Sequence, residues 1–132
     1  LHFQKPPYAQ TKLLRILRGR IFDAVVDIRK ESPRFGQFVA VELSAEDGSA
    51  ILVPEGFAHG FMSLEAETEV LYKVSDFYTP EAEGGINAFD PDLDIAWPLD
   101  RVGGQDAVFL SARDAAFPML RDLPLAFIYS ER

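Results

Sequence analysis

Five side chains in this sequence have types suited to proton transfer: His2, Lys12, His59, Tyr72 and Asp114. A neutral imidazole accepts a proton near pH 7 because its unperturbed pKa is about 6.5, whereas a phenol with a pKa of about 10 stays protonated and can donate. A carboxylate can orient an imidazole, and an ammonium can stabilise negative charge that develops on an oxygen. These residues could therefore exchange protons with a substrate, provided that the fold brings them together.

Each of these residues also has an ordinary structural interpretation. A histidine in an apolar strand is more often a hydrogen-bonded structural residue than a catalyst, and Tyr72 in EVLYKV could pack in the core with its hydroxyl satisfied. Lys12 could be a solvated strand residue, and Asp114 an acid that the first turn of a helix favours. Taken singly, the five residues do not indicate an enzyme.

The spacing of the two histidines does not favour a metal centre. Barrels that hold a metal often use a His-x-His pair with a carboxylate and a further histidine. This chain has two histidines, 57 positions apart, and no His-x-His pair. We expect no metal and no cofactor, although a site of two histidines and one carboxylate stays open.

The elements that must position these residues are mostly strands. Short runs rich in Val, Ile and Phe are separated by turn signals such as KESPRFG (30–36) and AEDGS (45–49). The expected strands are 13–19, 20–29, 36–44, 49–54, 58–64 and 68–78. This pattern predicts one all-β domain over residues 1–132, a barrel or sandwich with room for a ligand at its mouth.

The second half of the chain is predicted to be less regular. Residues 80–98 form a long loop with little strand character in this interpretation. Ser111 is the expected N-cap of a short helix over 111–123, which Pro118 breaks or kinks.

Composition and charge exclude several classes of function. The net charge of −8 argues against a nucleic-acid partner, the absence of cysteine fits a reducing cytoplasm, and no apolar run is long enough to span a membrane. Residues 1–34 nevertheless carry eight basic and three acidic residues. This basic segment could bind an anionic small molecule such as a phosphate ester, or it could be a solvated strand face.

The joint pattern of motifs is more informative than any single residue. The blocks that resemble, in this order, the dTDP-4-dehydrorhamnose 3,5-epimerase family are residues 1–36 with LHFQ and AQTK, VPEGFAHGFMSL (53–64), EVLYKVSDFYTPEAEGGI (69–86), DPDLDIAWP (90–98) and LSARD (110–114). The resemblance implies a cupin-like jelly-roll barrel with a short C-terminal helical segment. It also implies a chain that lacks an N-terminal segment of several dozen residues and has impaired activity on its own.

The resemblance implies metal-independent epimerisation of a dTDP-linked 4-keto-6-deoxy sugar at carbons 3 and 5. The alternatives are a mono-epimerase or ketoisomerase of the same kind and a non-catalytic sugar-nucleotide binding module. We also expect a homodimer, because family dimers exchange strands and because exposed strand edges need to be covered.

The resemblance further assigns roles by position. His2 matches the base, Asp114 the carboxylate that pairs with it, Lys12 the ammonium near the ketone oxygen, and Tyr72 the acid on the opposite face. The matching substrate-binding positions are His59, Tyr78, Gln10 and Arg113. Three positions depart from the family pattern: Arg113 stands where lysine is more frequent, and Ala88-Phe89 replaces Trp-Asn.

Overall fold

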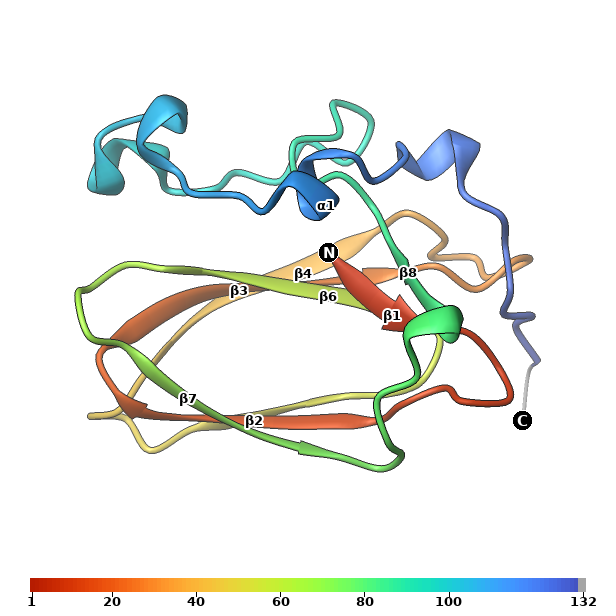
Figure 1. The fold of residues 1–132 in the computed structure, drawn as a ribbon, viewed down its shortest axis with the longest axis horizontal. Helices are drawn as coiled ribbons and strands as arrows, with labels where there is room; N and C mark the ends of the chain where they lie inside the picture. Colours follow the sequence, from red (N-terminus) through yellow and green to blue (C-terminus); the bar gives the residue numbers. More distant parts are fainter. Residues whose placement is uncertain (131–132) are drawn as a thin grey trace.

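The computed structural model of the chain describes residues 1–130, and the last two residues of the expected domain lie outside the described part. Two antiparallel sheets face each other as two layers (Figure 1). The five-stranded sheet has the order β4 (Phe38–Ser44), β3 (Arg20–Asp27), β6 (Phe57–Ser63), β1 (His2–Gln4) and β8 (Glu83–Gly85). The three-stranded sheet has the order β5 (Ala50–Val53), β2 (Lys12–Arg18) and β7 (Glu69–Val74). The all-β prediction is confirmed, and each of the six expected strands is present with both ends within four residues of those predicted.

The outer face of the five-stranded sheet carries the main hydrophobic core. Side chains alternate along a strand, so Ala24 and Val26 of β3 face outward together with Ala58 of β6. The C-terminal arm, residues 86–130, runs over this face (Figure 1) and contributes Ile86 and Leu120 to the same cluster. Burying a side chain of this size stabilises the fold by about 2 kcal/mol, which holds the arm against the sheet.

The space between the two sheets divides into an apolar part and a polar part. Ile16, Ile21 and Leu43 form a small buried cluster there. Further along β3, Asp23 lies on the same inner face as Ile21 and pairs with Phe61 of β6. His59 is two residues from Phe61 on β6, so its side chain lies on this inner face as well. The polar inner positions thus lie between the two sheets, next to the apolar cluster.

Two short strands were missed by the sequence patterns. β1 and β8 pair with each other, and the partners include His2 with Gly85 and Gln4 with Glu83. Glycine weakens a strand on propensity alone, but here a side chain at Gly84 would come within 2.5 Å of the Phe3 ring. Packing of Gly84 against the buried Phe3 ring therefore explains why β8 forms in spite of its glycines.

The predicted C-terminal helix is much shorter than expected. Ser111 does cap it, because its side chain accepts a hydrogen bond of 3.0 Å from the backbone N–H of Asp114. The α-helix, α1, covers only Ala112–Ala115. Phe117 precedes Pro118, and a residue before proline disfavours the helical region, so the helix ends early. Single 3₁₀ turns η1 (Pro80–Ala82), η2 (Leu99–Val102), η3 (Gln105–Ala107) and η4 (Leu120–Asp122) complete the described chain.

Helices in the described chain are all too short to cross a lipid bilayer.

Asp27 at the end of β3 anchors the following turn and gives a prediction on stability. The buried carboxylate accepts hydrogen bonds from Arg29 Nε at 2.9 Å, Arg29 Nη2 at 2.6 Å and Ser32 Oγ at 2.7 Å. Burial by itself raises the pKa of Asp27, but these hydrogen bonds outweigh it and hold the pKa below its usual value. We expect Asp27→Asn to lower the free energy of unfolding at pH 7 by about 2 kcal/mol.

The pH dependence of the Asp27 contribution follows from the direction of its pKa. Because the folded pKa is depressed, the contribution is complete above the unfolded value of about 3.9 and is lost as the pH falls through the folded value. Denaturant unfolding at pH 7 and pH 3 should therefore show a smaller difference between wild type and Asp27→Asn at pH 3. The exposed Asp106→Asn is the matched control and should change neither value. An equal loss at both pH values would contradict this account.

Candidate active site

His2 lies between two carboxylates. Its Nδ1 is 3.1 Å from Glu83 Oε1, and its Nε2 is 3.1 Å from Asp114 Oδ1. Strand β1 positions the ring, because its pairing with β6 sets His2 opposite His59 and its pairing with β8 brings Glu83 alongside. The edge of the Phe117 ring packs against the imidazole at a centroid distance of 5.1 Å.

Asp114 reaches His2 from α1 of the C-terminal arm. Burial raises the pKa of Asp114, but the hydrogen bond and charge of His2 and the hydrogen bond to Ser111 outweigh burial, and the net shift is downward. The side chain is therefore a carboxylate near neutral pH. Its Oδ1 lies 3.1 Å from Nε2, within reach of the imidazole.

Lys12 and Tyr72 face His2 from the other sheet. They lie on the adjacent strands β2 and β7, where Tyr72 pairs with Leu14, two residues beyond Lys12. Lys12 Nζ donates a hydrogen bond of 3.3 Å to the backbone carbonyl of His2. Burial lowers the pKa of Lys12, although the negative charges of Glu83 and Asp23 oppose the shift. Burial and Asp23 raise the pKa of Tyr72, so the phenol keeps its proton at neutral pH.

His59 forms a separate buried pair with Asp23. His59 Nε2 is 2.8 Å from Asp23 Oδ2, and the two side chains are 2% and 0% exposed. The His59 ring lies beside Tyr72 with its centroid 6.3 Å away. Asp23 was not singled out from the sequence, although an acid in the middle of the apolar run IFDAVV (21–26) was a usable signal, because a lone charge on a buried strand face needs a partner.

One hollow of about 370 Å³ joins the five residues selected for proton transfer. Its polar lining consists of His2, Lys12, His59, Tyr72 and Asp114. An imidazole and a phenol thus reach the same space from opposite sheets, together with an ammonium. This arrangement can remove a proton at one face of a bound molecule, stabilise an anion and return a proton at another face.

The predicted substrate-binding residues lie beside this hollow. Gln10, Tyr78 and Glu83 line an adjoining space of about 300 Å³ that also touches His2, Lys12 and Tyr72. Tyr78 donates its hydroxyl to Glu83 Oε2 at 3.0 Å, and Arg113 Nη1 donates to the same oxygen at 2.7 Å. Glu83, the residue on which these contacts meet, was missed because PEAEGG looks like an ordinary turn and its pairing with β1 is not local.

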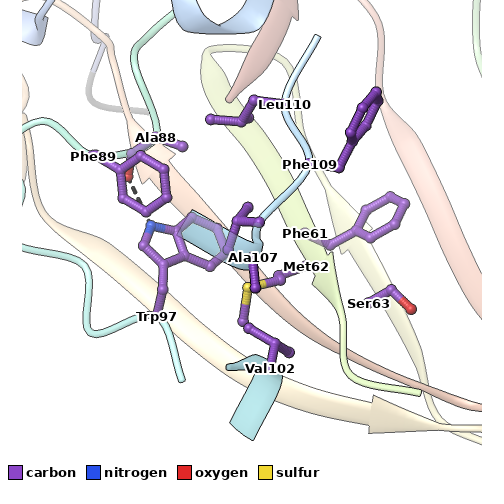
Figure 2. A pocket seen from close by; sticks show the side chains of 11 residues that line it. Phe61, Met62, Ser63, Ala88, Phe89, Trp97, Val102, Ala107, Phe109 and Leu110 are labelled. Atoms are coloured by element: carbon purple, nitrogen blue, oxygen red, sulfur yellow. Dashed lines mark hydrogen bonds between the residues drawn. The ribbon is translucent and has the colours of Figure 1, made fainter. Parts of the chain in front are cut away.

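A third, apolar hollow of about 270 Å³ extends the site along β6 (Figure 2). It shares Phe61, Ala88, Trp97 and Leu110 with the polar hollow. Trp97 Nε1 donates a hydrogen bond of 2.7 Å to the Ala88 carbonyl, which fixes the indole as a wall between loop and sheet. Ala88 and Phe89, which replace the Trp-Asn of the family pattern, lie in this wall, so the replacement changes the apolar side of the site.

Among residues 1–130, no group of three or more His, Asp or Glu side chains has an arrangement that could hold a metal ion.

Comparison with known proteins identifies the kind of protein that this fold and site represent. The model of the dTDP-4-dehydrorhamnose 3,5-epimerase family matches residues 1–122. The dTDP-4-dehydrorhamnose 3,5-epimerase of Sinorhizobium fredii is 45% identical over 129 residues, which cover 98% of this chain and 64% of the relative. The chain spans less than two thirds of the length of the curated relatives that match it first.

Solved structures agree with this match. The dTDP-6-deoxy-D-glucose-3,5-epimerase of Legionella pneumophila, in complex with dTDP-4-keto-L-rhamnose, superposes with a TM-score of 0.90 at 42% identity, covering 99% of this chain and 68% of that one. A 3'-monoepimerase from Streptomyces bikiniensis, in complex with dTDP-quinovose, gives a TM-score of 0.83 at 37% identity over 91% of this chain and 58% of that one. The fold is a cupin-like jelly roll, as in these epimerases. The chain belongs to the dTDP-4-dehydrorhamnose 3,5-epimerase family.

Proposed function

We propose that the protein epimerises a dTDP-linked 4-keto-6-deoxy sugar at carbons 3 and 5 without a metal or redox cofactor. The observation that carries this proposal is the shared hollow in which His2, Lys12 and Tyr72 meet. The Legionella relative, which was solved with dTDP-4-keto-L-rhamnose, supports the class of substrate.

The proposed reaction uses the acidity of the two C–H bonds beside the ketone. His2 removes a proton, the C–H electron pair becomes a carbon–carbon double bond, and the carbonyl electrons move onto oxygen. Lys12 stabilises that oxyanion with its positive charge. Tyr72 then gives a proton to the opposite face of the carbon, and the carbonyl re-forms. The His2 imidazolium then loses its proton to water and the Tyr72 phenolate takes one from water, which restores both groups for the second carbon. Asp114 stabilises the His2 imidazolium during these steps.

Four further residues are proposed to bind the substrate around this centre. His59 lines the same hollow, and its pairing with Asp23 keeps its ring fixed against Tyr72. Gln10 and Tyr78 line the adjoining space, and Arg113 lies beside it through its contact with Glu83. The exposed guanidinium of Arg113 suits a phosphate group, because a guanidinium donates two hydrogen bonds to phosphate oxygens.

Deuterium incorporation tests the proposal directly. The chain is incubated in heavy water with the dTDP-linked 4-keto-6-deoxyglucose, and the carbons beside the ketone are read by NMR. We expect deuterium at both carbons and inversion at both. Binding without exchange in folded protein would overturn the proposal in favour of a non-catalytic binding module.

A second candidate reaction is inversion of a single carbon. The similarity to a 3'-monoepimerase and the changed apolar wall at Ala88-Phe89 favour it as an alternative. The same experiment separates the two, because a mono-epimerase gives a product inverted at one carbon only.

The absence of a metal requirement gives a further prediction. Dialysis against a chelator should leave the rate of deuterium incorporation unchanged, because the proposed oxyanion partner is the Lys12 ammonium. Loss of exchange after dialysis, with recovery on adding back a divalent cation, would contradict this part of the proposal.

We also propose that the protein forms a homodimer. Four leucines on the outer face of the three-stranded sheet are exposed, and these are Leu13, Leu17, Leu52 and Leu71. Arg15 and Lys73 lie on the same face, and a group of exposed leucines among polar residues is suited to an interface between identical chains. Sedimentation as a monomer at all concentrations would contradict it. The cytoplasmic location and the lack of a nucleic-acid partner stay predictions.

A further inference from the structure

The three hollows of the site lie in a row. The shared hollow borders the adjoining space through His2, Lys12 and Tyr72, which line both. It borders the apolar hollow through four other residues, and these are Phe61, Ala88, Trp97 and Leu110. Within the described chain, the apolar hollow and the adjoining space have no lining residue in common. A molecule in the shared hollow therefore has a polar side and an apolar side.

The four residues between the shared and apolar hollows, here called the shared wall, offer a bound molecule no free polar side chain. Phe61, Ala88 and Leu110 have hydrocarbon side chains. The indole N–H of Trp97 donates to the Ala88 carbonyl at 2.7 Å, so this donor already has its acceptor (Figure 2). A hydroxyl held against these side chains would give up its hydrogen bonds to water without a side-chain partner in return.

Polar and charged groups lie on the other side of the shared hollow. Gln10 and Tyr78 line the adjoining space, and Arg113 contacts Glu83 there. By contrast, none of the described residues that line the apolar hollow is charged. The serine at its far end, Ser63, donates its hydroxyl to the Glu65 carbonyl at 2.8 Å. The anionic part of a ligand therefore suits the side of the adjoining space, and an apolar part suits the shared wall.

The proposed substrate has the same division into a polar and an apolar part. A dTDP-linked 4-keto-6-deoxyhexose carries oxygen substituents at carbons 1, 2 and 3, with the diphosphate at carbon 1. Its one apolar substituent is the methyl group of carbon 6, attached to carbon 5. Carbons 1 and 5 are separated by the ring oxygen, so the diphosphate and the methyl group leave the ring in different directions.

The shared wall lies beside the groups that act on carbon 5. The Phe61 ring centroid is 6.1 Å from that of Tyr72, the proposed proton donor. When carbon 5 lies between His2 and Tyr72, its methyl group can face the shared wall while the oxygen substituents face the polar side. Burying the methyl group there removes apolar surface from water.

We propose that the shared wall is the subsite for carbon 6 of the keto sugar and selects sugars with an apolar group at that carbon. The identity of the sugar rests on the proposed function. Ala88 sets the size of the subsite, because it has the smallest side chain of the wall at a position where the family pattern has tryptophan. The wall opens into the apolar hollow of about 270 Å³, so an apolar group larger than methyl also fits.

Two unreactive sugars test this selection without catalysis. dTDP-6-deoxyglucose and dTDP-glucose both lack the ketone, and they differ only by the hydroxyl at carbon 6. Calorimetric titration of the chain should give a Kd about 10²-fold larger for dTDP-glucose, which is the extent to which an apolar pocket rejects an added hydroxyl. Equal Kd values for the two sugars would overturn the proposal.

A third sugar separates polarity from size. The homologue of dTDP-6-deoxyglucose with an ethyl group at carbon 5 has as many heavy atoms there as dTDP-glucose but no hydroxyl. Wild type should bind it at least as tightly as dTDP-6-deoxyglucose, because the added methylene is buried in the apolar hollow. Rejection of both the ethyl sugar and dTDP-glucose would show that size governs this position and would overturn the proposal.

The Ala88→Ser variant tests where carbon 6 lies. Its hydroxyl supplies a polar partner at the shared wall, so the ratio of the Kd values for dTDP-glucose and dTDP-6-deoxyglucose should fall about fivefold, the effect of one hydrogen bond. Ala66→Ser, in the exposed turn after β6, is the matched control and should keep the wild-type ratio. A wild-type ratio in Ala88→Ser as well would contradict the placement of carbon 6 at this wall.

The Ala88→Trp variant tests the size of the subsite and the orientation of the ligand. An indole at this position should fill the space beside the wall and weaken binding of the ethyl sugar about tenfold or more. dTDP alone has no carbon 6, so its Kd should not change, and this unchanged Kd also shows that the variant is folded. Weaker binding of dTDP by folded Ala88→Trp would place the nucleotide in the apolar hollow and overturn the proposal. If Ala88→Trp fails to fold, the three sugars and Ala88→Ser still decide.

The result is independent of epimerisation, because none of the three sugars has a ketone. If wild type discriminates between the sugars as expected but incorporates no deuterium into the keto sugar, the proposed function fails and the carbon-6 subsite stands. If deuterium enters the keto sugar while dTDP-6-deoxyglucose and dTDP-glucose bind equally, the subsite fails and the proposed function stands.

Discussion

Replacing His2 by Asn is expected to abolish deuterium incorporation at both carbons beside the ketone. In the proposed mechanism one imidazole removes both protons, and a positioned general base contributes about 10²–10⁴-fold to the rate. Asparagine has no basic nitrogen, although its amide can still contact Glu83. The rate constant for exchange at each carbon, measured by NMR in heavy water, should therefore fall by about 10³-fold or more.

His59 supplies the matched control for this result. Both imidazoles line the same hollow, but His59 Nε2 is already bonded to Asp23, so His59→Asn should raise KM while exchange continues at both carbons. An exchange rate in His2→Asn within about tenfold of wild type would show that another group is the base, since this is less than a general base supplies. Loss of exchange in both variants to the same extent would contradict the separate roles of the two histidines.

Replacing Tyr72 by Phe is expected to separate exchange from inversion. The phenol lies across the hollow from His2, and its raised pKa keeps it protonated, as a proton donor must be. Without the hydroxyl, His2 can still remove a proton and return a deuteron to the face from which the proton left. Deuterium should therefore enter with retained configuration, while the rate of inversion falls by about 10²-fold or more.

Tyr78→Phe is the control for Tyr72→Phe. Its hydroxyl bonds to Glu83 in the adjoining space, so its loss should weaken binding without separating exchange from inversion. Product configuration and deuterium content, read from the same NMR sample, distinguish the two outcomes. Inversion at the normal rate in Tyr72→Phe would show that the proton on the second face comes from a different group.

Asp23 connects several of these residues electrostatically. It lies fully buried, bonds to His59 and raises the pKa of Tyr72, while its charge counteracts the lowering of the Lys12 pKa by burial. One carboxylate thus helps to keep the phenol protonated and the ammonium charged. This combination of protonation states is the one that the proposed acid and oxyanion partner require.

The local patterns were sufficient where structure depends on neighbours in the chain. Runs of β-branched and aromatic residues between turn signals predicted strands β2 to β7. A serine before a short helical stretch predicted the N-cap at Ser111. These features depend on strand propensity, turn chemistry and one short-range hydrogen bond, all of which a sequence displays.

Local patterns failed where long-range packing overrides propensity. β1 and β8 are three residues each and pair over about eighty positions, and β8 contains two glycines that fit because aromatic rings fill the adjacent space. The helix after Ser111 stops after one turn because Pro118 and contacts of the arm with the sheet take precedence over helical spacing.

By itself the sequence determined the all-β class, the family and the five residues with the chemistry for proton transfer, since each depends on residue types and motif order. The tertiary structure alone decided that His2, Lys12, His59, Tyr72 and Asp114 share one hollow, and that Asp23 and Glu83 are their partners. The physical reason is that sheet pairing and the packing of the C-terminal arm join residues far apart in the chain. Such contacts leave no local pattern, whereas charge, size and acidity belong to each residue wherever it lies.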